Sequence, residues 1–62
     1  MNDYESMINK IKEAIGTEKY IKNKQYFSYE NDAIYYNKDN MHYELISKIS
    51  KEVTSGINNI VN

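Results

Sequence analysis

Residues 40–61 read NMHYELISKISKEVTSGINNIV and hold the longest regular pattern in the chain. The apolar residues recur at steps of three and four, the spacing of one face of an α-helix. They are Leu45, Ile46, Ile49, Val53, Ile57, Ile60 and Val61. We predict a long helix here, capped by Asp39 or Asn40, whose apolar stripe the other residues must cover. Gly56 either lies inside this helix or ends it near Ser55, and the spacing beyond Gly56 favours continuation.

A second helical pattern lies at the start of the chain. Its apolar face consists of Tyr4, Met7, Ile8, Ile11, Ala14 and Ile15. Asn2 or Asp3 can cap the first turn, and Gly16 follows the last apolar residue, where a left-handed C-terminal cap is expected. The pattern predicts a helix over residues 3–15.

The middle of the chain is rich in aromatic residues and predicts a β-hairpin. Residues 26–30 and 33–36 are typical of strands, and Asn31-Asp32 between them tolerates the positive φ of a tight turn. A two-residue loop would pair Tyr29 with Ile34 and Phe27 with Tyr36 on one side, and would leave Tyr26, Ser28, Ala33 and Tyr35 on the other. Residues 18–21 form either a third, edge strand or one helical turn capped by Thr17; the strand is preferred because a lone hairpin is weak.

These elements predict one α+β domain, residues 1–62. Its order is a helix, a two- or three-stranded antiparallel sheet and a long helix, with both helices on one face of the sheet. The last helix would be about 10 Å longer than the first, at 1.5 Å per residue. Its overhanging end would need a cover, which a second copy of the chain can provide. We therefore expect a homodimer that associates through Ile49, Val53, Gly56, Ile57 and Ile60.

Composition excludes several classes of function. The 62 residues include no Cys and one His, so disulfides, thiolate metal sites and multi-histidine sites are ruled out. Basic and acidic residues nearly balance, and no basic residue is Arg, which argues against sequence-specific DNA reading. No motif for a nucleophile, a phosphate loop or a metal is present. We expect no enzyme, no catalytic residue, no metal and no cofactor.

The chain also lacks an apolar run of the roughly 18 residues that a membrane span requires. Its first residues, Met1-Asn2-Asp3-Tyr4-Glu5, do not resemble a signal peptide. The expected compartment is the cytoplasm, which would be that of the host if the protein is viral.

The tyrosines are the strongest functional signal. Seven tyrosines accompany a single Phe and no Trp. In the predicted register Tyr26 and Tyr35 face away from the helices, and tyrosine is common at binding hot spots. The candidate partner-binding residues are Tyr26, Tyr35, Ser28, Glu30 and Asp32, where the acidic members can meet a basic groove. AT-rich coding combined with strand propensity is the competing explanation for so many tyrosines.

Lysines interleave with aromatic residues before the hairpin. Lys19, Lys22 and Lys24 lie near Tyr20 and Phe27, an arrangement that can contact single-stranded nucleic acid. The same lysines can instead protect an edge strand from unwanted pairing.

Three functions remain open on this basis. The first is a non-enzymatic binding protein, such as a phage or mobile-element inhibitor that covers a surface of a host defence or nucleic-acid-processing protein. The small size and the helix–sheet–helix order resemble those of some small phage anti-CRISPR proteins. The second is a small homodimeric, nucleic-acid-associated regulatory protein, and the third is a small subunit of a larger assembly.

Overall fold

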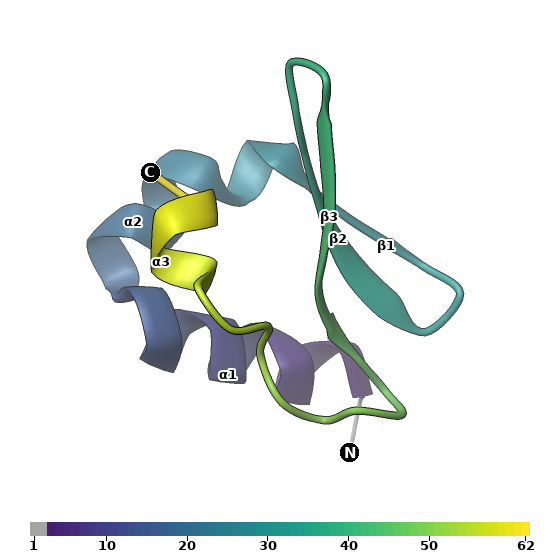
Figure 1. The fold of residues 1–62 in the computed structure, drawn as a ribbon. Helices are drawn as coiled ribbons and strands as arrows, with labels where there is room; N and C mark the ends of the chain where they lie inside the picture. The colour runs from purple at the N-terminus through teal and green to yellow at the C-terminus, as the bar shows by residue number, and fades with distance from the viewer. Residues whose placement is uncertain (1–2) are drawn as a thin grey trace.

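The computed structural model describes residues 3–62, which form α-helices and one three-stranded antiparallel sheet (Figure 1). The elements in chain order are α1 (Asp3–Ile15), α2 (Thr17–Asn23), the 3-10 helix η1 (Lys24–Tyr26), β1 (Phe27–Glu30), β2 (Ala33–Lys38), β3 (Met41–Ser47) and α3 (Ile57–Ile60). The α+β class is confirmed. The helices gather on one side of the sheet, as predicted, and the strand order is β1-β2-β3.

The first helix has the predicted bounds. Its acidic residues Asp3 and Glu5 lie in the first turn, where their negative charges interact favourably with the positive end of the helix dipole. Met7, Ile8, Ile11 and Ile15 are its buried residues. Gly16 follows the helix with φ 90° and ψ 156°, so it has the expected positive φ but not the expected left-handed helical conformation. Its N–H donates to the carbonyl of Lys12 at 2.8 Å, and the same residue is the N-cap of α2.

Residues 18–21 do not form the preferred edge strand, and this prediction is wrong. They belong to the helix α2, which packs against α1. The reason is visible at the end of α2, where the buried Asn23 side chain donates to the carbonyls of Lys19 and Asn62. The Lys19 carbonyl lies four residues before Asn23, so this contact stabilises a helical turn and could not form in a strand. The third strand of the sheet is β3, which follows the hairpin in the chain.

The hairpin of β1 and β2 is confirmed, including its register. Phe27 pairs with Tyr36 and Tyr29 with Ile34. Asn31 and Asp32 have φ of 52° and 59°, so both central residues of the two-residue turn are left-handed. This is the backbone of a type I′ turn, whose twist matches that of the strands.

The predicted long helix over residues 40–61 is wrong. Its first part is the strand β3, which pairs antiparallel with β2 across a turn at residues 39–40. Asp39 takes positive φ in this turn and caps no helix. A bulge places Tyr35 opposite Glu44 and Ile34 opposite Ile46, so Leu45 is the extra residue of β3. Leu45 and Ile46 are both buried, which strict strand alternation would forbid.

The rest of that region is a loop followed by the short helix α3. Residues 48–56 run back along α1 (Figure 1), and the Thr54 N–H donates to the Leu45 carbonyl at 2.8 Å. Gly56, at φ 77°, precedes α3 and starts it rather than lying inside a helix. The end of the chain does not overhang, because Ile57 and Val61 are buried against the core. The resemblance in element order to small anti-CRISPR proteins relied on a long C-terminal helix, and α3 is short.

The core lies between the sheet and the helices. It is formed by Met7, Ile8, Ile11, Ile15, Ile34, Tyr36, Leu45, Ile46, Ile57 and Val61. These core residues come from α1, β2, β3, α3 and the residue after α3. The elements α2, η1 and β1 each pack a partly buried aromatic ring against this core. The other face of the sheet is therefore left without a helical cover.

Candidate functional site

The side of the sheet that faces away from the helices is the candidate site. Alternation from the buried Ile34 and Tyr36 assigns the opposite side chains to this surface. We call it the open face, and its accessible residues are Ser28, Glu30, Tyr35, Asn37, His42 and Glu44; Ala33, which shares this side by its pairing with Glu30, is buried. Ser28 and Tyr35 are half-buried and the other four are exposed. No element of residues 3–62 covers this side in Figure 1.

A chain of side-chain contacts orders the open face across all three strands. The Asn37 amide donates from Nδ2 to Oγ of Ser28 at 2.7 Å, and its Oδ1 is the partner of His42 Nδ1. An amide oxygen only accepts, so Nδ1 of His42 is the donor in this contact. The His42 ring stacks on Tyr35, with centroids 4.8 Å apart and planes at 17°. The face is therefore organised before any partner arrives.

The charged residues of the open face have one sign. Glu30 and Glu44 are its carboxylates, and none of its members is a lysine. The nearest lysine along β2 is Lys38, whose Nζ lies instead over the Tyr26 ring, 5.2 Å from the centroid. The surface thus combines a stacked aromatic pair with two carboxylates, a combination that suits Arg or Lys side chains.

The structure places three of the five predicted partner-binding residues on this face: Ser28, Glu30 and Tyr35. Asp32 lies in the adjoining turn, where Oδ1 accepts from the Tyr29 hydroxyl at 3.4 Å. Tyr26 is not on the open face, and its predicted position beside Tyr35 is wrong. It belongs to η1, so strand alternation does not reach it, and its ring packs edge-on against the buried Tyr36.

Sequence reasoning missed Asn37, His42 and Glu44 as members of the face. In the predicted helix over residues 40–61, His42 and Glu44 would be two residues apart and would not face each other. In β3 these two residues alternate with Met41 and Tyr43, which leads both onto the open face. The pair Asp39-Asn40 was the available signal, because it also reads as a two-residue hairpin turn.

The far end of the β2–β3 hairpin projects beyond the helices (Figure 1). Met41 and Tyr43 lie on the helix side of this hairpin and are 38% and 44% exposed. They adjoin the open face at its edge, since His42 lies between them in the chain. The projection extends the surface that a partner can reach.

The five residues of the expected dimer seam do not share one face. Ile57 is buried, Val53 and Ile60 pack partly buried on the core, and Gly56 caps α3. Ile49 lies in the loop and is 93% exposed. The seam is absent because the long helix is absent, and the homodimer itself stays a prediction.

The lysines expected to contact nucleic acid lie on α2 and η1. Lys19 Nζ donates to the backbone carbonyl of Asn58 at 3.2 Å, so it ties α2 to α3. Lys22 and Lys24 are exposed. The intended stacking partners are partly buried against the core, where the Tyr20 and Phe27 rings contact each other at 5.9 Å. The lysine that lies over the Tyr20 ring is Lys12 of α1, 4.8 Å from the centroid, and not one of the three predicted lysines.

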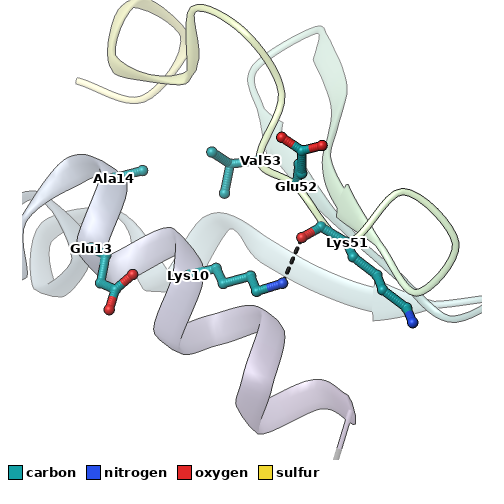
Figure 2. A pocket seen from close by; sticks show the side chains of 6 residues that line it. All are labelled: Lys10, Glu13, Ala14, Lys51, Glu52 and Val53. Atoms are coloured by element: carbon teal, nitrogen blue, oxygen red, sulfur yellow. Dashed lines mark hydrogen bonds between the residues drawn. The ribbon is translucent and has the colours of Figure 1, made fainter.

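A depression lies on the helix side of the molecule, near the core. Figure 2 shows it between α1 and the loop, lined by Lys10, Glu13, Ala14, Lys51, Glu52 and Val53, with a volume of about 420 Å³. Lys10 reaches across it and donates to the Lys51 carbonyl at 2.6 Å. Glu13 and Glu52 point away from each other, so they do not form a carboxylate pair.

Comparisons of the chain with protein-family models, curated proteins and solved structures found no match. Within residues 3–62 no three His, Cys, Asp or Glu side chains are grouped as metal ligands would be. No helix in the same residues has the length and apolar character needed to cross a membrane. The geometry of the open face is therefore the basis for assigning a function.

Proposed function

We propose that this protein is a non-enzymatic binding module that occupies a surface of a larger protein through its open face. The observation that carries the proposal is the contact chain Ser28–Asn37–His42–Tyr35, which orders an uncovered sheet surface. Side chains that are already ordered lose less conformational entropy on association. Tyrosine adds a large, rigid contact area with a polar end.

The charge of the face indicates the chemistry of the partner. Glu30 and Glu44 flank the Tyr35–His42 stack, so a basic surface complements it. Guanidinium groups pair with carboxylates and stack on aromatic rings, which makes arginine the best-suited contact. Proteins that process nucleic acid carry such basic surfaces, because they neutralise phosphates.

An inhibitor of a nucleic-acid-processing or defence protein, carried by a phage or mobile element, fits this chemistry. Such a protein acts by covering the basic surface, and it needs neither catalytic residues nor a cofactor. A patch with two carboxylates and an aromatic stack can compete with phosphates for the same lysines and arginines. The small size of the chain suits an agent that blocks without chemistry.

Comparative capture from a cell extract tests this proposal. The test variant is Glu30→Lys/Glu44→Lys, which reverses the charge of the open face. The matched control is Glu13→Lys/Glu18→Lys, which makes the same charge change at exposed positions of α1 and α2. We expect a basic protein that the parent and the control retain and the test variant loses. Equal retention by both variants contradicts the proposal.

A further inference from the structure

Lysines gather at a second surface, on the helix side of the molecule. A hollow of about 250 Å³ lies between α1 and the end of β3, and we call it the lysine hollow. It is lined by Asp3, Ser6, Met7, Lys10, Ser47, Lys48 and Lys51. Three lysines face one carboxylate here, although the chain as a whole has a net charge of −1. The hollow is therefore locally basic.

The fold, not the local sequence, brings these lysines together. Lys10 comes from α1 and lies 41 residues before Lys51 in the chain. Lys51 has a φ of 59°, and its N–H donates to the Ser47 carbonyl at 2.9 Å, which closes a tight turn. The Ser50 side chain braces the turn through the Ser47 hydroxyl at 3.1 Å. Lys10 then holds this turn against α1 through its bond to the Lys51 carbonyl (Figure 2).

The protein contacts of these lysines leave most of their charge uncompensated. Lys48 Nζ lies 3.4 Å from the Asp3 carboxylate, but both side chains are more than half exposed, so water screens this pair. Lys10 donates to a neutral carbonyl, which does not cancel its charge. The Lys48–Asp3 contact is the one ion pair in residues 3–62. Like charges raise the local potential and attract anions.

We propose that the lysine hollow binds a phosphate group. Ammonium groups form strong, charge-assisted hydrogen bonds with phosphate oxygens, and lysine binds phosphate as a point charge. The volume is ample for one phosphate, and the Ser6 hydroxyl of the lining can add a further donor, whereas the Ser47 hydroxyl already donates to Oγ of Ser50. This site lies on the helix side of the sheet, and it does not depend on the proposed partner of the open face.

Titration of isotope-labelled protein with inorganic phosphate, followed by NMR, tests the site. We expect saturable shifts at Lys10, Ser47, Lys48 and Lys51, and none when sodium chloride is added to the same ionic strength. Lys48→Gln/Lys51→Gln should weaken binding about tenfold, because two solvent-exposed charged contacts to phosphate are lost. The control Lys22→Gln/Lys24→Gln removes two exposed lysines outside the hollow and should bind as the parent does.

A variant that gains affinity makes the test independent of folding defects. Asp3→Asn removes the carboxylate of the hollow, so phosphate should bind more tightly to it than to the parent. A nucleoside monophosphate, tested in parallel, distinguishes a nucleotide from free phosphate by the tighter of the two affinities. Three outcomes would overturn the proposal: shifts that do not saturate, shifts that chloride reproduces, or equal losses in the test and control lysine pairs.

Discussion

Asn23 is the residue that joins the ends of this small fold. Its side chain is almost fully buried, accepts from the Tyr36 hydroxyl at 3.0 Å, and donates to two backbone carbonyls. All of its polar atoms therefore have partners, so its burial carries no unpaired group. In the sequence it stands between two lysines, and no local pattern indicated that it is buried. Only the tertiary arrangement of α2, β2 and the last residue explains it.

Replacing Asn23 by alanine should lower the free energy of unfolding by about 1–3 kcal/mol, since the buried Tyr36 hydroxyl and the carbonyls of Lys19 and Asn62 would lose their partner. Tyr36→Phe should cost less, about 1 kcal/mol, because Asn23 keeps its two backbone contacts. Urea denaturation of both single variants and the double variant measures the coupling between them. Additive effects would contradict the hydrogen bond.

The ionisation of the Tyr29 hydroxyl reports on its surroundings in the folded protein. Desolvation, and then the charge of the Asp32 carboxylate, which accepts a hydrogen bond from the Tyr29 hydroxyl, raise the pKa of Tyr29 above its ordinary value. A raised pKa in the folded state favours the neutral hydroxyl, so this contribution to stability is present below the unfolded pKa and is lost as pH rises through the folded one. Asp32→Asn should lower the Tyr29 pKa. Ring resonances followed by NMR through alkaline pH measure it, and an unchanged value would exclude the Asp32 contribution.

Helices and strands with strong local signals were predicted correctly, whereas β3 was predicted as a helix. The helix over residues 3–15 and the Asn31-Asp32 hairpin are set by local signals: an apolar face, a glycine cap and a two-residue turn. Residues 40–61 carry an apolar spacing that fits a helix, but their first part is a strand. Its consecutive residues Leu45 and Ile46 are both buried because a bulge turns both inward. A bulge depends on the partner strand and on Thr54, which pairs with the Leu45 carbonyl. Periodicity in one segment cannot reveal such a contact.

The same limit applies to the candidate site. Ser28, Glu30 and Tyr35 were predicted because they lie in the well-signalled hairpin. His42 and Glu44 were missed because their strand was read as a helix, and Tyr26 was misplaced because the 3-10 helix η1 precedes β1. Tertiary pairing, rather than composition, decides which side chains share the open face.

Two isoleucines of the former helix pattern test the new assignment. Ile49→Lys should change the free energy of unfolding by no more than about 0.5 kcal/mol, because Ile49 is exposed in the loop. Ile57→Ala should cost about 2–5 kcal/mol, because Ile57 is buried where α3 meets α1. Thermal and urea unfolding measure both. Similar losses for the two variants would restore a continuous helix with one apolar stripe.

The whole molecule presents charges of opposite sign on different surfaces. The open face carries Glu30 and Glu44, whereas the lysine hollow lies on the helix side. A near-neutral net charge therefore hides a local separation. For an acidic face that docks on a basic partner, the complex should form more slowly and bind less tightly as salt rises. Binding kinetics at several salt concentrations measure this, and a salt-independent association rate would contradict the charge argument.

The most direct test of the central claim is site-specific photo-crosslinking in a cell extract. A photoreactive amino acid replaces Tyr35 on the open face in one sample and Ile21, which is 60% exposed on α2, in the other. We predict a crosslinked partner from position 35 that is absent from position 21 and is competed away by the parent protein but not by Glu30→Lys/Glu44→Lys. A partner crosslinked from position 21 and not from position 35 would contradict the assignment of the open face as the binding surface.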